Sequence, residues 1–207
     1  TDCKNQIQLT KSCLSNVTLE RKFTCKFHFK QYSSSLLIKK STFSFSFIYL
    51  LLKKIIMLKI GDKVPNINVT THKGESINLS DFKGKKIVLF FYPRANTPGC
   101  TAQGCNLNDN YSKLTSQGYE VIGVSPDTVE KQNNFADKFG FKYNLLADDS
   151  RELIDAFGVW GKKKFRGNEY EGVMRTTFII NEEGIIETVI DKVNTKEHTN
   201  QIIDCYL

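Results

Sequence analysis

Cys100 occupies the position in this sequence best suited to nucleophilic chemistry. It follows Thr97-Pro98-Gly99, where an apolar strand, Lys85 to Tyr92, is predicted to give way to a helix. The first turn of a helix has backbone N–H groups without intrahelical acceptors and the positive end of the helix dipole, and both stabilise an anion. Because the thiolate is the reactive form of cysteine, this position favours a nucleophile. The alternative is a buried cysteine that serves as a small apolar side chain.

A second cysteine, Cys105, lies five residues further along the same predicted helix. In an ideal helix, such positions are about 7.5 Å apart along the axis and about 140° apart around it. Disulfides need Cα atoms roughly 4.4–6.8 Å apart, so the two cysteines cannot bond until the first turns of the helix unwind. A structural disulfide would avoid that requirement, whereas a catalytic one can use it as a switch.

Three further residues could complete a site around Cys100. Pro93 restricts the segment before the helix, and the Thr97 hydroxyl is a candidate donor to the sulfur or to a bound oxygen. Arg175 stands at the entrance of a predicted buried strand, Thr176 to Ile180. An arginine there is more often a surface residue, but one that points to the end of the sheet would face the Cys100 segment.

Strands and helices alternate along the chain from Met57 onward. Apolar runs rich in β-branched and aromatic residues predict buried strands, and helical periods bounded by Pro, Asp or Gly predict helices. The predicted architecture is an α/β fold with a mixed central β-sheet flanked by helices and an N-terminal β-hairpin. The expected strands are 67–69, 76–79, 85–92, 119–125, 143–146, 176–180 and 185–190, and the expected helices are about 100–113, 126–139, 149–157 and 195 onward.

The pattern Pro93-x-x-x-Thr97-x-x-Cys100 resembles the active-site signature of peroxiredoxins. Cys105, the context Gly99-Cys100-Thr101 and the strand Arg175-Thr176-Thr177-Phe178 are similar to the peroxiredoxin Q branch of the AhpC/TSA family, also called bacterioferritin comigratory protein. The resemblance covers residues 57–205, and nothing upstream of Met57 shares it. Its flanking motifs are Gly61-Asp62-Lys63-Val64-Pro65, Leu79-Ser80-Asp81-Phe82-Lys83-Gly84 and Phe157-Gly158-Val159-Trp160.

This resemblance implies a thioredoxin-like fold and a thiol peroxidase that reduces hydrogen peroxide and organic hydroperoxides. Cys100 would attack the peroxide and become a sulfenic acid, and Cys105 would convert it to an intramolecular disulfide that a thioredoxin-type reductant reduces. Thr97 and nearby backbone amides would bind the peroxide oxygens, Arg175 would hold the thiolate and polarise the substrate, and Pro93 would shield the site from water. The resemblance implies no metal or organic cofactor, and we expect a monomer.

The basic charge of the chain is confined to its first 56 residues. The chain has 29 Lys+Arg and 22 Asp+Glu, a formal net charge of +7. Residues 1–56 hold 10 of the basic and 2 of the acidic residues, which leaves 19 and 20 for residues 57–207. The second part is therefore nearly neutral and has no basic surface for nucleic acid. We expect it to form one domain.

Three interpretations stand for residues 1–56: sequence upstream of a true start at Met57, an organelle-targeting leader, or a genuine basic extension. Leaders are Ser-rich and acid-poor, but they usually favour Arg, and the segment holds only Arg21. We expect the segment to be disordered. The apolar run Phe43 to Leu52 is too short to span a bilayer, so no membrane segment is expected. The expected location is the cytoplasm, or an organelle stroma or matrix if the segment is a leader.

The three histidines are assigned to the surface. His28, His72 and His198 have no carboxylate or cysteine at catalytic spacing. Lys162 to Arg166 is expected to be a solvated loop, with docking of an acidic reductant as the alternative. The six cysteines lack the paired spacing of a zinc site and the distribution of a disulfide scaffold, and Cys205 is expected near a frayed end. A reducing compartment fits this usage best.

Two other functions compete with the peroxidase. A thioredoxin-like dithiol–disulfide oxidoreductase would use two cysteines separated by two residues, whereas four residues separate Cys100 from Cys105. A non-enzymatic alternative is that residues 1–56 form a basic arm that attaches the core to a membrane or to nucleic acid.

Overall fold

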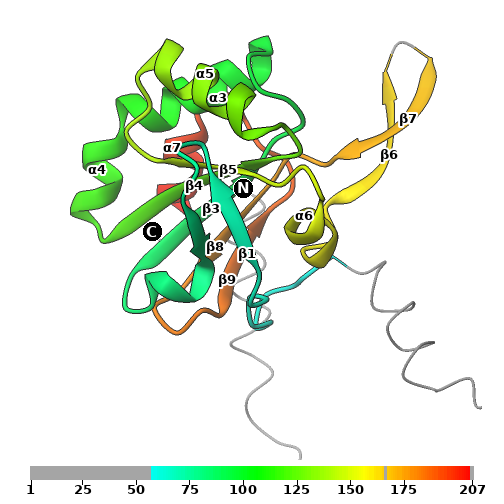
Figure 1. Cartoon of the computed structure of the whole chain (residues 1–207). Coiled ribbons are helices and arrows are strands. Elements are labelled where there is room, and N and C mark those ends of the chain that lie inside the picture. Colours follow the sequence, from blue (N-terminus) through cyan, green and yellow to red (C-terminus); the bar gives the residue numbers. More distant parts are fainter. Residues whose placement is uncertain (1–56, 166, 206–207) are drawn as a thin grey trace, which may run out of the picture. The chain divides into compact units, whose positions relative to one another are not determined.

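A mixed seven-stranded sheet lies at the centre of the fold. The computed structural model describes residues 57–165 and 167–205, so the expectations for residues 1–56 lie outside it. The strand order is β2-β1-β5-β4-β3-β8-β9 (Figure 1). The strands are β1 (Asn68–Thr71), β2 (Ser76–Asn78), β3 (Lys86–Phe91), β4 (Tyr119–Ser125), β5 (Asn144–Ala147), β8 (Thr176–Ile180) and β9 (Ile186–Ile190).

Strand direction confirms the predicted α/β class. β3 runs parallel to β4, and β4 runs parallel to β5, while β8, β9, β1 and β2 join antiparallel to their neighbours. β1 and β2 form the expected N-terminal hairpin, followed by a short 3-10 helix (Leu79–Phe82). The helices are α3 (Pro98–Asp109), α4 (Tyr111–Ser116), α5 (Val129–Phe139), α6 (Glu152–Ala156) and α7 (His198–Asp204).

Both faces of the sheet are buried, which explains why β3 is an uninterrupted apolar run. Ile87, Leu89 and Phe91 on one face belong to the apolar cluster that includes Leu153 and Phe157 of the α6 region. Alternate residues of β3 face the other side, where the Phe90 ring meets Tyr143 edge-on. The end of β3 is thereby fixed by packing on both sides, directly before the segment that carries Cys100.

One predicted helix is two helices in the structure. The expected helix of about 100–113 ends at Asp109 as α3, and α4 begins at Tyr111. Asn110 lies between them, and its side chain donates to the Asn106 carbonyl. Asparagine competes for backbone hydrogen bonds in this way, which favours helix ends over helix interiors.

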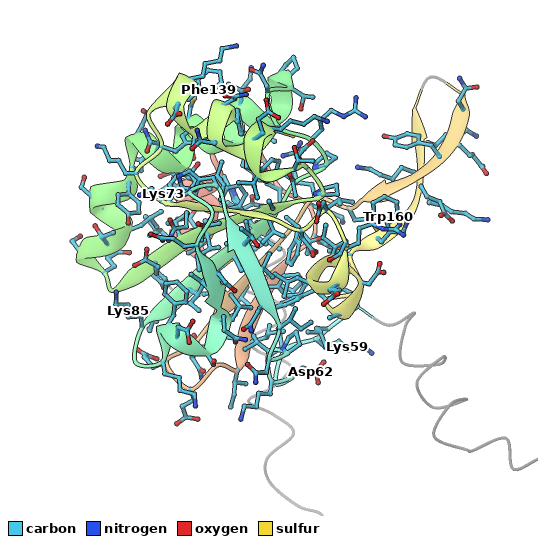
Figure 2. The ribbon with its side chains drawn as sticks, viewed as in Figure 1. Lys59, Asp62, Lys73, Lys85, Phe139 and Trp160 are labelled. Atoms are coloured by element: carbon cyan, nitrogen blue, oxygen red, sulfur yellow. The ribbon has the colours of Figure 1, made fainter. Side chains whose placement is uncertain are left out.

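The sequence predicts a solvated loop for Lys162 to Arg166, and for Lys162 to Phe165 this prediction is wrong. Two antiparallel strands, β6 (Trp160–Phe165) and β7 (Asn168–Val173), pair with each other and project from the rest of the fold (Figure 1). Figure 2 shows Trp160 where the hairpin joins the fold, and the Arg151 guanidinium lies 4.5 Å from the centre of its ring. Lys163 is half-buried in β6 and donates to the Val173 carbonyl. Backbone hydrogen bonds between β6 and β7, with little apolar burial, therefore hold these two polar strands together.

Surface positions for His72 and His198 are also wrong, and Cys205, expected near a frayed end, is buried. His198 is fully buried, His72 is 6% exposed and the Cys205 thiol is 5% exposed. His72 accepts a hydrogen bond from the Leu145 amide, and burial is the main cause that lowers its pKa. His28 lies outside the described residues. Among residues 57–165 and 167–205, no helix has both the length and the apolar character needed to cross a membrane.

Candidate active site

Cys100 is the third residue of α3, in the first helical turn after β3. Thr97 is the N-cap residue and Pro98 is the first helical residue, where proline is favoured because its missing N–H would have no acceptor. The Thr101 amide bonds the Thr97 carbonyl and closes this turn. Cys100 is 3% exposed. The sulfur thus lies at the positive end of α3, where backbone dipoles stabilise an anion.

Arg175, at the start of β8, reaches the Cys100 sulfur. Its Nη2 lies 3.2 Å from Sγ, and its Nη1 donates to Oε1 of Gln103 one turn further along α3. The guanidinium also packs over the backbone of Gly99, 3.5 Å from where a Cβ would stand. An arginine is always protonated and offers donors in a rigid fork, so it supplies the charge that a thiolate needs.

Thr97 and Pro93 flank this pair on the segment between β3 and α3. The Thr97 hydroxyl donates to the Arg94 carbonyl at 3.1 Å; of its two candidate acceptors, the Cys100 sulfur and a bound oxygen, the sulfur is therefore not the one it bonds in this structure. Pro93 is half-buried directly after the buried end of β3. The structure therefore brings Cys100 and Arg175 into contact, and it places Thr97 and Pro93 on the adjoining segment.

A buried polar network beneath this segment went unrecognised in the sequence. Asp127 accepts hydrogen bonds from the Ala95 amide at 2.7 Å and from the Ser125 hydroxyl at 2.9 Å. Gln132 donates to Ser125 Oγ and accepts from the Tyr92 hydroxyl. Burial raises the pKa of Tyr92, which keeps that hydroxyl a donor. The network joins the start of α5 to the Cys100 segment, and the only sequence signal was the Pro-Asp-Thr run taken as a helix start.

Cys105 lies on the same unbroken helix as Cys100, with both thiols reduced. It is half-buried, and burial, followed by the nearby Asp109 carboxylate, raises its pKa. Between the two cysteines, Gly104 lies against the Phe141 ring, whose Cζ would be only 2.7 Å from a Cβ at this position. The intact helix therefore keeps Cys105 protonated and apart from Cys100.

Gln103 and His198 extend the contacts of Arg175 into the core. Gln103 Nε2 lies 2.9 Å from His198 Nδ1, and His198 Nε2 lies 3.1 Å from Thr177 Oγ1 on β8. All three side chains are fully buried. Burial, followed by the charge of Arg175, lowers the pKa of His198 to about 3. Its partners lie far away in the sequence, so local spacing could not reveal them.

Asn106, directly after Cys105, ties α3 to α7. Its side-chain oxygen accepts from the amide and the hydroxyl of Thr199, and its side-chain nitrogen donates to the Lys196 carbonyl. The helix is therefore anchored immediately beyond the second cysteine. Among the residues that the structure describes, no three His, Cys, Asp or Glu side chains are grouped to hold a metal ion.

Comparison with known proteins matches residues 60–189 to the AhpC/TSA family. The chain is 41% identical to Peroxiredoxin Bcp of Escherichia coli over 147 residues, which are 71% of this chain and 94% of that protein. It is also 41% identical to Peroxiredoxin Bcp of Bacillus subtilis over 146 residues, which are 70% and 93% of the two chains.

Solved structures share the fold. A cysteine-to-serine mutant of Xanthomonas campestris peroxiredoxin Q aligns with a TM-score of 0.64 and 30% identity, over 68% of this chain and 89% of that one. A similar mutant of PrxQ from Xylella fastidiosa aligns with a TM-score of 0.68 and 28% identity, over 72% and 95%. These similarities confirm the thioredoxin-like fold.

Proposed function

The chain belongs to the AhpC/TSA family as a peroxiredoxin of the Bcp or peroxiredoxin Q type, a thiol peroxidase, and from this we propose that Cys100 attacks the peroxide. The observation that carries the proposal is the 3.2 Å contact between Arg175 Nη2 and the Cys100 sulfur at the start of α3. A fixed cation and a helix N-terminus act together on one sulfur, and both favour the nucleophilic thiolate.

In the first step, the Cys100 thiolate attacks the terminal oxygen of a hydroperoxide. A sulfur–oxygen bond forms as the oxygen–oxygen bond breaks, and the leaving oxygen takes up a proton and departs as an alcohol, or as water from hydrogen peroxide. Cys100 is left as a sulfenic acid. Arg175 and the backbone amides of the first helical turn stabilise the charge on the departing oxygen.

Thr97 and Pro93 have supporting roles in this proposal. The Thr97 hydroxyl now bonds the Arg94 carbonyl, and rotation about its Cα–Cβ bond would exchange that acceptor for a peroxide oxygen. Pro93, half-buried beside the site, shields it from water. Hydrogen peroxide and organic hydroperoxides are the proposed substrates; a solved structure of the Xanthomonas campestris relative is titled for alkyl peroxide reduction.

In the second step, Cys105 resolves the sulfenic acid. The start of α3 unwinds, the Cys105 sulfur attacks the Cys100 sulfur, and the sulfur–oxygen bond breaks with release of water. The resulting disulfide accepts two electrons and two protons from a thioredoxin-type dithiol, which becomes a disulfide in turn. Unwinding is required because both cysteines lie on one intact helix.

We further propose that residues 57–207 act as one domain, as a monomer, in a reducing compartment such as the cytoplasm. Two observations support this. The family match covers residues 60–189. Both cysteines of the proposed cycle lie on α3 of the same chain, so the disulfide needs no second copy.

Three cysteine variants test the proposed cycle, with peroxide consumption followed in the presence of thioredoxin and its reductase. C100S should consume no peroxide. C105S should reduce one equivalent of peroxide, form the Cys100 sulfenic acid and then stall, because thioredoxin finds no disulfide to reduce. C205S is the matched control and should turn over like the wild type, since it removes a buried thiol outside the site. Peroxide turnover by C100S, or full turnover by C105S on thioredoxin alone, would refute the assigned roles.

A further inference from the structure

A chain of hydrogen bonds runs from Arg175 through Gln103 and His198 to Thr177. This chain fixes the protonation state of His198. A guanidinium only donates, so Gln103 must present its carbonyl oxygen to Arg175. The Gln103 amide nitrogen then donates to His198 Nδ1, which must be unprotonated. The proton of the neutral ring therefore sits on Nε2, from which it is donated to Thr177 Oγ1.

A proton on Nδ1 of His198 would break this chain of contacts. The Gln103 amide would face a second donor, and if it flipped to offer its oxygen to His198, its nitrogen would face the donors of Arg175. Either arrangement leaves two buried donors facing each other without an acceptor, which is unfavourable. Only neutral His198 lets Gln103 and Arg175 keep their positions together.

We propose that neutral His198 is a positioning residue of the peroxidase: through Gln103 it holds the Arg175 guanidinium against the Cys100 sulfur, and it is released when the start of α3 unwinds. The inference rests on the proposed catalytic cycle. His198 touches neither cysteine in the described hydrogen bonds and acts through two other side chains.

Release follows from the place of Gln103 in the chain. It lies between the two cysteines, so it must leave its site when Cys100 and Cys105 are brought together. In the intact structure Asn106, directly after Cys105, ties α3 to α7. We expect this tie to keep α7 in place during unwinding, so that His198 loses the Gln103 amide as its donor. The structure thus couples the redox state of two cysteines to the surroundings of a histidine that contacts neither.

The charge of Arg175, at the start of β8, lowers the pKa of His198. α3 presents the neutral Gln103 amide and β8 the neutral Thr177 hydroxyl, while Glu197 on α7 is exposed. Burial and Arg175 hold the pKa of His198 at about 3, against 6.5 for a free histidine. Protonation therefore favours the unwound form as pH falls below about 6.5.

The first test is an NMR titration of the histidine rings in the full chain. The reduced form is kept in dithiothreitol, and the disulfide form is made with one equivalent of hydrogen peroxide. Because the chain has six cysteines, peptide mapping by mass spectrometry must place the disulfide between Cys100 and Cys105. In the reduced protein, the His198 signals should not move between about pH 5 and 8. In the disulfide form they should titrate near pH 6.5. His72 is the internal reference, since β5 and β4 separate its hairpin from β3, and H28Q assigns the remaining signal.

The outcomes separate the two levels of the proposal. A verified disulfide in which His198 still fails to titrate would overturn the inference and leave the peroxidase cycle intact. If no disulfide forms between Cys100 and Cys105, the resolving step itself is wrong, and the release of His198 falls with it. Titration of His198 already in the reduced protein would also overturn the inference, because the chain of hydrogen bonds requires a neutral ring.

The second test uses substitutions of His198 and measures kcat/KM for hydrogen peroxide. H198F removes the acceptor for Gln103 and should lower kcat/KM about tenfold, the effect of losing one buried hydrogen bond. H198Q can still offer a carbonyl oxygen to Gln103 and should recover most of that loss. H72Q is the matched control at His72, which is also buried in the described part of the chain, and should keep the wild-type rate. A purely structural role would lower stability in both His198 variants without this difference in rate, and equal rates for H198F and H198Q would overturn the proposal.

Discussion

Replacing Arg175 by Met should slow peroxide reduction about 10- to 150-fold. The substitution keeps a long, flexible side chain but removes the Nη2 contact to the Cys100 sulfur at 3.2 Å. A hydrogen bond to a charged group contributes about 1.5–3 kcal/mol, and each 1.4 kcal/mol in the barrier corresponds to about tenfold in rate. Because Gln103 also loses its donor, the upper part of that range is expected.

The assay is the second-order rate of hydrogen peroxide loss with dithiothreitol in excess, which bypasses the thioredoxin step. R151M is the matched control, since it removes a guanidinium that stacks on Trp160 at 4.5 Å and should leave the rate unchanged. Urea unfolding of both variants shows whether each remains folded. A folded R175M with a rate within about threefold of wild type would refute the role given to Arg175.

Three further predictions follow from packing and buried charge. G104A should lower the free energy of unfolding by about 1–3 kcal/mol, because its Cβ would stand 2.7 Å from Phe141 Cζ; a change below about 0.5 kcal/mol in urea unfolding would contradict this. D127N should destabilise the fold by about 1–3 kcal/mol and also lower kcat/KM, since the carboxylate holds the Ala95 amide; an unaltered rate would show that the segment needs no such support. Burial lowers the pKa of His72, so the unfolded chain binds more protons below about pH 6.5 and stability falls with pH; H72Q should lose less stability than wild type between pH 7 and 5, and equal losses in urea unfolding would count against it.

The central strands and the Cys100 helix were predictable because their signals are local. The apolar run of β3 is buried on both faces, and Pro98, two residues before Cys100, marks the start of the helix. The sequence also placed Arg175 at the start of β8, but it did not show where the Arg175 side chain points. The antiparallel pairing of β3 with β8, which sets Thr176 opposite Phe91, brings Arg175 to the end of β3 and so to the Cys100 segment.

The rest depended on contacts between distant parts of the chain. His198 bonds Gln103, 95 residues away, and the burial of a histidine by such a partner leaves no mark in its own neighbourhood. β6 and β7 were missed because their outward side chains are polar on much of their length, so alternation was weak and Lys162 to Lys164 looked like a loop. The sequence places Asp127 only in the run that opens a helix, and its bond to the Ala95 amide, 32 residues away, has no local signal.

The attachment of Asn106 to α7 sets how far the two sulfurs can separate. β3 holds the chain before Cys100, and Thr199 and Lys196 hold it directly after Cys105, so the unwound stretch remains a short tether. A short tether gives an effective concentration of about millimolar or more. Disulfide formation should then be first order and unaffected by dilution of the protein. A second peroxide molecule, which would carry the sulfenic acid on to sulfinic acid, must outcompete a thiol that never diffuses away.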